Sequence, residues 1–487
     1  MTSLASKAAR GGAVTLISQV LKVAVMFVST VILARLLSPE EFGLVAMVLA
    51  IFGVGEIFRD FGLSMAALQA KKLSHAQQSN LFWINAIVGL CLSLIFFLAA
   101  APISIFFERP ELVEAGQVLC LTFLLGGLTT QFKVVINRQL RFVSLAITDL
   151  VPYVSGAAAA IVVGALTASY WALVAQQLII AAGTLILAVC LSGWRPSLPS
   201  KAPMRELVSF GASFAGTQFV SYISRNVDSV MIGKFWGSVS LGYYDRAYNL
   251  VVLPLTQINT PMSRVAVPVL ARTQTEDERY VAYLRRAQLV ALYVTSTIFA
   301  LLAGLAEPLV LLLLGPQWQA SAMLLSILAI SGVFRSLVQV AYWVYVSRGL
   351  AAVQFRFYLV AQPILVCIIL AGVPFGAVGV ATAVAIGYAL FWVASLAWVK
   401  RASGLPLGVL YLDAFRAIFL LAAPIAGVSA LASHMKVVGG LPEVIQLIAG
   451  LGAALVWCIG VTLASRRVRG DLKMLVDFLK RAVVRNK

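Results

Sequence analysis

The sequence predicts an all-α polytopic membrane protein, and three observations lead to this fold class. Of the 487 residues, 61% are hydrophobic and 11% are charged, whereas a soluble chain averages about 45–50% apolar and about 25% charged residues. Apolar runs of the ~20 residues that a helix needs to cross a bilayer recur along the whole chain, and its mean hydropathy is +0.95. Lys and Arg are concentrated in alternate connections between those runs, as expected of loops that face the cytoplasm.

Fourteen apolar segments are each expected to form a membrane-spanning helix. Helices are required because lipid cannot satisfy the backbone groups of an open strand or loop. The first run is longer than the core of ~7–15 residues in a cleavable signal peptide, so we expect it to stay as a helix. The segments are residues 11–37, 42–68, 80–106, 112–132, 143–165, 170–192, 206–235, 241–270, 287–314, 320–346, 354–373, 377–398, 412–432 and 443–464.

The basic residues orient the chain. The odd-numbered connections and the segment ends beside them contain only Arg35, Arg109, Lys234 and Lys436, while the termini and the even-numbered connections hold most of the other cations. By the positive-inside rule, both termini are expected in the cytoplasm. The same loops explain the net charge of +18. Because the cations are scattered over short loops and form no aromatic-studded patch, nucleic acid is not expected as a partner.

The residue types that carry catalysis are poorly placed for it. The sequence contains no nucleotide-binding loop, no paired-histidine zinc motif and no serine elbow, and no predicted outward loop has room for a catalytic domain. We therefore expect no enzyme activity, no resident cofactor and no metal site. The five cysteines lie inside apolar runs and the two histidines in connections; they are Cys91, Cys120, Cys190, Cys367 and Cys458, and His75 and His434.

The chain also repeats itself. The stretch "LARLLSPEEFGLVAM" (33–47) aligns with "IGKFWGSVSLGYYDR" (232–246) at an offset of 199 residues, which places Gly43 on Gly242 and Arg35 on Lys234. Six helices separate the copies, so both have the same orientation, as in transporters built from parallel repeats. This predicts two six-helix lobes, residues 1–200 and 201–400, followed by two helices in 401–465. Chance similarity between apolar segments is the alternative.

The C-terminal tail, residues 466–487, is basic and has an apolar face. It is expected to be an amphipathic helix on the anionic cytoplasmic lipid surface, and a frayed basic tail is the alternative. The apolar face comprises Leu472, Leu475, Val476, Leu479 and Val483.

Charged residues inside the apolar segments point to a functional site. The stretch "TQFVSYISRNVDSVMIG" (217–233) places Arg225 and Asp228 well inside a segment, where a charge costs about 2.5–3.5 kcal/mol on insertion scales. Polar faces that cannot meet lipid must meet each other or water, so we expect a wet cavity between the lobes. Its predicted polar stripes, at helical spacing, contain Thr15, Ser18, Gln19, Lys22 and Ser29 in the first segment, and Thr217, Ser221 and Ser224 beside Arg225 and Asp228 in the seventh.

Four of these intramembrane residues are cations: Lys22, Arg59, Arg225 and Arg335. Arg225 with Asp228, and Arg59 with Glu56, are spaced to form ion pairs of purely structural value. Lys22 and Arg335 have no acidic residue at helical spacing. Cations in a cavity with apolar, low-dielectric walls favour an anionic substrate such as a phosphate or diphosphate.

Three intramembrane acids are candidates to bind a coupling ion, Na⁺ or H⁺: Glu56, Asp60 and Asp228. The sequence does not distinguish the two ions.

Five stretches resemble a known family. They are the repeat stretch 33–47, "FGLSMAALQAKKLSHAQQSNLFWIN" (61–85), "NRQLRF" (137–142), "NVDSVMIGKFWGSVSLGYYDRAYNL" (226–250) and "LLGPQW" (313–318). Together they resemble the polysaccharide transporter family of bacterial flippases, within the multidrug/oligosaccharidyl-lipid/polysaccharide exporter superfamily, and especially the colanic acid and exopolysaccharide exporters. The resemblance implies alternating access and an undecaprenyl-diphosphate-linked oligosaccharide as substrate. It also implies an inner-membrane location, and a polysaccharide polymerase and a chain-length regulator as further partners.

Two other function classes remain open at this point. A multidrug cation antiporter of the same superfamily would need a cavity dominated by acids and aromatics, and the intramembrane cations argue against it. A membrane polymerase, ligase or acyltransferase would be expected to have a large outward loop or an intramembrane histidine, and the sequence indicates neither.

Overall fold

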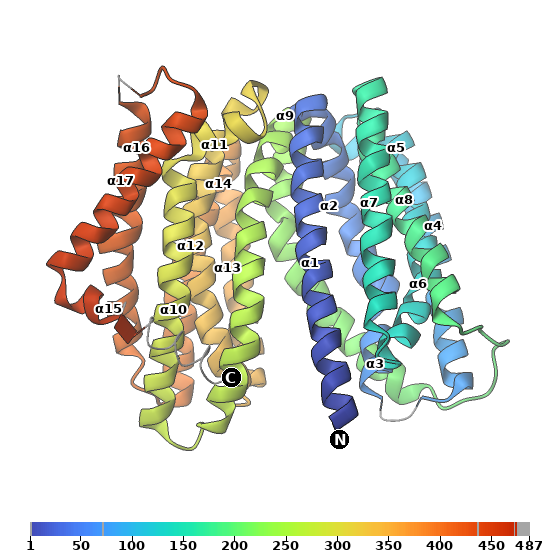
Figure 1. Ribbon diagram of the computed structural model, residues 1–487. Helices are drawn as coiled ribbons and strands as arrows, with labels where there is room; N and C mark the ends of the chain where they lie inside the picture. Colours follow the sequence, from blue (N-terminus) through green and yellow to red (C-terminus); the bar gives the residue numbers. More distant parts are fainter. Residues whose placement is uncertain (1, 71–72, 436–437, 472, 475–487) are drawn as a thin grey trace. The chain divides into compact units, whose positions relative to one another are not determined.

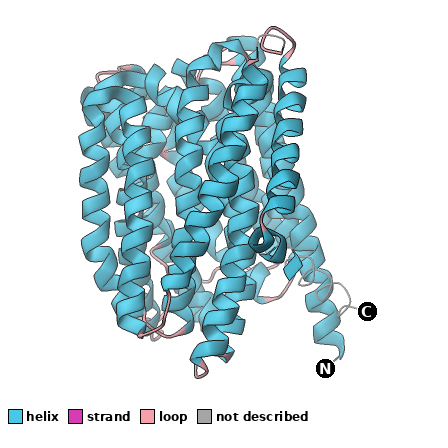
Figure 2. Cartoon of the chain, turned by 90° about the vertical axis from the view of Figure 1, so that its left-hand side faces the viewer, coloured by secondary structure: helices cyan, strands magenta, loops and turns pink. Residues whose placement is uncertain are grey.

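The computed structural model describes residues 2–70, 73–435, 438–471 and 473–474. The side chains of residues 2–10, 13, 210, 212–214, 216, 217, 219–221 and 223 lie outside that description. Throughout the described ranges the chain is helical, with short loops and no strand (Figure 2). This confirms the all-α fold class.

The chain divides into two compact units, Met1–Gly242 and Tyr243–Lys487. In the first unit, α7 packs against α1 and α8, while α6 packs against α4 and α8 (Figure 1). Its helices are α1 (Thr2–Leu36), α2 (Pro39–Asp60), α3 (Leu63–Gln69), α4 (His75–Phe107), α5 (Glu111–Leu119), α6 (Leu121–Arg138), α7 (Phe142–Thr167), α8 (Trp171–Ser192) and the first part of α9 (Arg205–Arg272).

In the second unit, α12 packs against α10 and α14, and α16 packs against α17. Trp343 and Val344 of α12 are fully buried in its core. The elements are the rest of α9, then α10 (Asp277–Gly304), α11 (Ala306–Leu313), η1 (Pro316–Trp318), α12 (Gln319–Ser347), α13 (Ala351–Gly372), η2 (Val373–Phe375), α14 (Gly376–Ser403), α15 (Gly408–Ala417), the π-helical turn η3 (Ile418–Ala422), α16 (Ala423–His434) and α17 (Glu443–Ala464).

Eleven candidate membrane spans, judged by length and composition, lie in the described part of the chain. They establish a multi-pass membrane protein. One of the eleven, Ala351–Ser403, contains both α13 and α14, which the short η2 turn at Pro374 separates. The predicted segments 206–235 and 241–270 both lie in α9, where Gly237 leaves helical geometry (φ 77°, ψ −179°). The number fourteen and the lobe boundaries at residues 200 and 400 remain predictions.

Several predicted segments differ from the helices in the structure. The segment 287–314 starts too late, since α10 begins at Asp277, and it includes the point where α10 ends at Gly304 before α11. The segment 42–68 lies within one candidate span, Pro39–Gln69, but it contains two helices, because Phe61 (φ 47°) and Gly62 (φ 64°) are left-handed and separate α2 from α3. The segment 112–132 ends too early, since α6 continues to Arg138. The sequence alone suggested that Lys133 begins a loop. In the structure its charge is paired with Asp149 of α7, Nζ to Oδ1 2.6 Å, so the helix continues through it.

Within the second unit, ion pairs and a hydrogen bond hold the residues that follow α17 against α10 and α15. Asp413 of α15, 1% exposed, accepts hydrogen bonds from Arg285 Nε (2.5 Å) and Nη2 (3.0 Å). It also pairs with Arg416 Nη2 at 3.1 Å. Arg416 in turn contacts Asp471 Oδ2 at 2.6 Å, and Tyr293 of α10 donates to that same oxygen at 2.9 Å.

The start of the tail is therefore packed against the protein. Residues 466–471 are helical, and Val468 is 1% exposed in an apolar cluster with Leu289 and Ile425. The five residues of the predicted apolar face, Leu472, Leu475, Val476, Leu479 and Val483, lie outside the described residues. The amphipathic tail remains a prediction.

Candidate functional site

The central element of the candidate site is α2. Ser38 caps its first turn by accepting from Glu41 N at 3.3 Å, Pro39 occupies the first turn, and left-handed Phe61 ends it. Near the C-terminal end, three residues apart, Arg59 Nη2 lies 2.9 Å from Glu56 Oε2. The side chains are 25% and 42% exposed, so the ion pair lies on a face of α2 that is open to a cavity.

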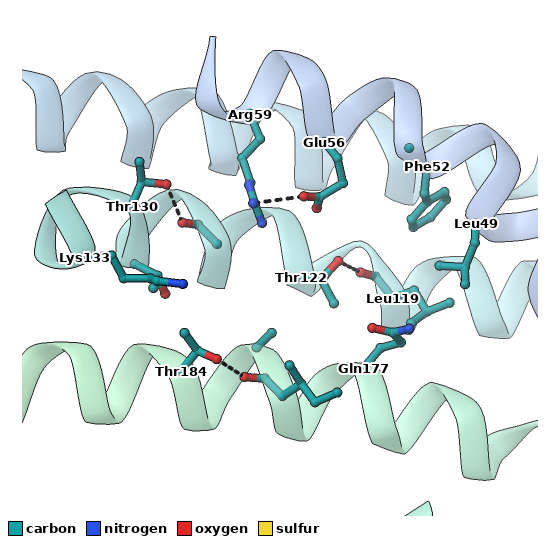
Figure 3. Close-up of a pocket in the computed structure, with 15 residues that line it drawn as sticks. Leu49, Phe52, Glu56, Arg59, Leu119, Thr122, Thr130, Lys133, Gln177 and Thr184 are labelled. Atoms are coloured by element: carbon teal, nitrogen blue, oxygen red, sulfur yellow. Dashed lines mark hydrogen bonds and ion pairs between the residues drawn. The ribbon is translucent and has the colours of Figure 1, made fainter. Parts of the chain in front are cut away.

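That first cavity has a volume of about 370 Å³ and lies between α2, α5, α6 and α8 (Figure 3). Lys133 of α6 reaches into it opposite Thr184 of α8. Its other polar lining residues are Glu56, Arg59, Thr122, Thr129, Thr130 and Gln177, and its apolar ones include Leu49, Phe52 and Ile180. We call it the α2–α6–α8 cavity.

A glycine lets Arg59 lie across α6. A Cβ added at Gly126 would be 1.7 Å from Arg59 Nη1, so any larger residue would displace the guanidinium. Asn85 Nδ2 of α4 donates to the Arg59 carbonyl at 3.2 Å, and Gln131 Nε2 donates to Asn85 Oδ1 at 3.0 Å. Neighbouring helices thus fix the end of α2 that carries the charged pair.

A second cavity, also about 370 Å³, lies within the same unit between α2 and the first part of α9. Gly53 and Glu56 line both cavities, so the Glu56 carboxylate borders each of them. The second cavity is also lined by Asp60, Gln218, Tyr222 and Arg225. Tyr222 donates its hydroxyl to the Ala50 carbonyl at 3.0 Å, which ties α9 to α2 beside the cavity.

The other predicted acids have distinct surroundings. Asp60 accepts from Ser64 N at 3.2 Å and from Ser64 Oγ at 2.5 Å, so it holds the turn between α2 and α3 while bordering the second cavity. Asp228 is 4% exposed and Ser224 is 7% exposed on α9. The side chains of Thr217 and Ser221 lie outside the described residues.

The predicted stripe of α1 stays close to its own helix. Thr15 donates to the Gly11 carbonyl at 2.8 Å, and Ser18 to the Thr15 carbonyl at 3.0 Å, while Gln19 is exposed. Lys22 Nζ lies over the ring of Tyr153 in α7, 5.3 Å from its centroid. Such an arrangement stabilises a cation electrostatically.

Arg335 of α12 belongs to the second unit. Its guanidinium carbon lies 5.2 Å from the ring centre of Tyr248 in α9 and 4.8 Å from that of Tyr388 in α14. Its Nη2 donates to the Tyr248 hydroxyl at 3.0 Å. Two aromatic rings therefore position this cation inside the helical core.

Sequence reasoning missed much of the α2–α6–α8 cavity. The sequence places Lys133 just after the predicted end of a helix at residue 132, and no pattern in it marks Asp149. The threonines were missed because a threonine in an apolar run resembles any other half-buried residue. The spacing of Thr122, Gly126, Thr129, Thr130 and Lys133, at helical intervals of three and four, was the available signal.

A different feature is a close backbone contact within the first unit, between the two stretches of the predicted repeat. A Cβ added at Gly43 would be 1.8 Å from the Ser238 carbonyl oxygen, and one at Gly242 would be 1.9 Å from the Pro39 carbonyl oxygen. Both pairs are related by the offset of 199, since Pro39 corresponds to Ser238 and Gly43 to Gly242. The backbones of α2 and α9 therefore approach each other closely at both positions.

Ion pairs surround this backbone contact. Glu40 Oε1 lies 2.9 Å from Arg109 Nη1 and accepts from Ser238 Oγ at 3.4 Å. Lys234 Nζ lies 2.7 Å from Glu108 Oε1. The hydrogen bond from Lys234 lowers the pKa of the exposed Glu108 carboxyl below its usual range.

The chain is similar in sequence to known proteins. Residues 32–323 match the sequence profile of a family described as "Polysaccharide biosynthesis protein". The teichuronic acid biosynthesis protein TuaB of Bacillus subtilis (strain 168) is 29% identical over 307 residues, 62% of this chain and 63% of that protein. The lipopolysaccharide biosynthesis protein WzxC of Escherichia coli (strain K12) is 23% identical over 387 residues, 78% of each. The match to TuaB thus covers less than two thirds of its length.

Solved structures show the same fold. The lipid II flippase MurJ in an inward closed conformation superposes with a TM-score of 0.71 at 14% identity, over 93% of this chain and 99% of that one. An outward-facing multidrug resistance transporter of the MATE family gives a TM-score of 0.54 at 13% identity, over 81% and 95%. At such identities the likeness concerns the fold alone.

Proposed function

Because the chain belongs to the family of polysaccharide biosynthesis proteins, we propose that it carries an undecaprenyl-diphosphate-linked oligosaccharide across the bacterial inner membrane, from the cytoplasmic to the outer leaflet. The observation that carries this proposal is the charged, threonine-lined cavity formed by α2, α6 and α8 inside an apolar helical unit. A headgroup of sugars and phosphates needs such polar surroundings to pass through lipid.

The fold alone does not indicate this substrate, since a multidrug transporter has the same fold. The family match and the relatives favour a polysaccharide-related substrate, because their names refer to polysaccharides. WzxC is named for lipopolysaccharide, and ExoT of Rhizobium meliloti (strain 1021) for succinoglycan transport. MurJ, whose fold is more similar than that of the multidrug transporter, is named a flippase for lipid II. We therefore propose a transporter and not an enzyme.

The proposed architecture has fourteen membrane helices in two six-helix lobes related by a parallel repeat, plus α15–α16 and α17 as two additional spans. The reciprocal contact of Gly43 with Ser238 and of Gly242 with Pro39 supports the repeat, because it joins equivalent positions of the two copies. Alternating access would then open and close this contact as the lobes rock.

The proposed topology places both termini in the cytoplasm and can be tested by labelling. Single cysteines at Ala168 and Ser200, both exposed, are introduced after the five native cysteines have been replaced. A membrane-impermeant maleimide added to whole cells is expected to label Ala168→Cys and not Ser200→Cys, because the connections alternate between the two sides. Labelling of both positions from outside would contradict the topology.

The charged residues have proposed roles in this cycle. Lys22, Arg225 and Arg335 attract the diphosphate, and movement of Na⁺ or H⁺ onto Glu56, Asp60 or Asp228 drives the return step. A polysaccharide polymerase and a chain-length regulator are the proposed partners that receive the oligosaccharide.

Reconstitution tests the proposed function directly. Liposomes containing the purified protein and a trace of lipid-linked oligosaccharide are probed with a sugar-oxidising or sugar-binding reagent that cannot cross the bilayer. We expect the accessible fraction to change with time only when the protein is present, and faster under an imposed Na⁺ or H⁺ gradient. An accessible fraction that is the same with and without protein would contradict the proposal.

A further inference from the structure

We infer that the α2–α6–α8 cavity binds the uncharged, hydroxyl-rich sugars of the substrate and not its diphosphate. The inference rests on the proposed function, and it names the part of the substrate that this cavity recognises. In this inference Arg59 neutralises the charge of Glu56 and does not bind an anion.

The charges at this cavity cancel. Arg59 pairs with Glu56 at 2.9 Å, and Lys133 pairs with Asp149 at 2.6 Å. Each cation therefore has its own carboxylate, and the two pairs together carry no net charge. A diphosphate would find little net attraction here and would have to compete with both carboxylates for the same cations. A neutral sugar meets no such competition.

The threonine hydroxyls give the cavity its specificity. Thr130 donates to the Gly126 carbonyl at 3.0 Å, and Thr184 to the Ile180 carbonyl at 2.6 Å (Figure 3). Thr122 and Thr129 likewise donate to Leu119 and Leu125 at 2.6 and 2.7 Å.

A hydroxyl has one hydrogen to donate and two lone pairs with which it accepts. Since all four donors are used within the helices, these threonines offer only lone pairs to a ligand.

The lone pairs of the threonine hydroxyls favour a ligand that donates hydrogen bonds. A sugar hydroxyl has a hydrogen to give, whereas an ionised phosphate has only acceptor oxygens. The Glu56 carboxylate and the amide oxygen of Gln177, which also lines the cavity, provide further acceptors. The volume of about 370 Å³ is within the ~300–1,000 Å³ typical of small-ligand pockets, which suits part of an oligosaccharide.

The repeat supplies an independent argument. At the offset of 199, Glu56 corresponds to Leu255 and Arg59 to Ile258 on α9. The second copy forms its helix with apolar residues at these positions, so the repeat does not need the charged pair in order to fold. A charged pair that is present in only one copy is suited to bind one end of a substrate whose two ends differ.

The test compares two lipids that differ only in the glycan. The first is the lipid-linked oligosaccharide extracted from a strain lacking this protein, and the second is undecaprenyl diphosphate. Binding of each to the purified full-length protein is measured for the wild type and for Thr130→Val/Thr184→Val, which removes two hydroxyls at nearly constant volume. The control, Thr167→Val/Thr382→Val, removes two exposed hydroxyls that make the same kind of bond to their own helices.

We expect the cavity variant to bind the glycan-bearing lipid about tenfold more weakly, as for two lost hydrogen bonds, and to bind undecaprenyl diphosphate as the wild type does. The control should match the wild type with both lipids. If the cavity variant weakens both lipids equally, or neither, the inference is overturned while the proposed function stands. If the wild type binds neither lipid, both are overturned. Thermal unfolding of each variant verifies that it is folded.

Discussion

Replacing Gly43 with alanine is expected to abolish most export, although the change adds one methyl group. That methyl would be 1.8 Å from the Ser238 carbonyl oxygen, and a backbone atom cannot move aside as a side-chain end can. Overpacking of this kind costs about 1–3 kcal/mol, which shifts an equilibrium between closed and open contact about 5- to 150-fold. Gly242→Ala is expected to act in the same way through Pro39. Polymer secretion by cells that carry each variant measures the effect.

The matched control is Gly452→Ala in α17. A Cβ at that glycine meets nothing within 4 Å, and alanine stabilises a helix by about 0.5–1 kcal/mol relative to glycine. This control should export normally. If Gly43→Ala and Gly242→Ala are expressed and export as well as the control, the contact has no part in the transport cycle.

Asp413→Asn is expected to destabilise the second unit strongly. The carboxylate is 1% exposed and joins Arg285 to Arg416. Removing one partner of a buried ion pair leaves uncompensated charge and costs about 3–5 kcal/mol. The loss will be nearer the lower figure, because Arg285 is 41% exposed and water screens it. Thermal unfolding of the detergent-purified protein provides the measurement.

Glu276→Gln serves as the comparison. Glu276 pairs with Arg279 on the surface, at 51% and 74% exposure, where an ion pair contributes about 0–1 kcal/mol. Its unfolding temperature should stay close to that of the wild type. Equal unfolding temperatures for Asp413→Asn and Glu276→Gln would show that the buried network does not hold α15 and the start of the tail in place.

The sequence predicts the helices well because apolar length is a strong signal, but it does not predict all of their breaks. Nothing in the composition of residues 42–68 marks Phe61 as left-handed, and the break there accompanies the packing of α3 against α4 and α6. By contrast, the break of α9 at Gly237 lies in the connection that the sequence predicts between residues 235 and 241. Breaks such as that at Phe61 depend on tertiary contacts that periodicity does not contain.

The candidate site was predicted in part, for a related reason. Depth in an apolar run is enough to select Glu56 and Arg59, and helical spacing pairs them. Lys133 and Asp149 are on different helices, so only the packing of α6 against α7 makes them partners. The threonines gain meaning only when α2, α6 and α8 enclose one cavity. Composition therefore identifies charges that are costly in lipid, and the fold determines which side chains they meet.

The most direct test of the proposed transport function is a deletion strain assayed for two products in parallel. Synthesis of the lipid-linked oligosaccharide precedes its transport, so it should continue without this protein. The account predicts that the lipid-linked oligosaccharide accumulates on the cytoplasmic face and that the secreted or surface polymer disappears. Mass analysis of the accumulated lipid would identify its sugars. Normal polymer without accumulated intermediate, in a strain with no second flippase, would contradict the account, as would accumulation of the intermediate on the outer leaflet.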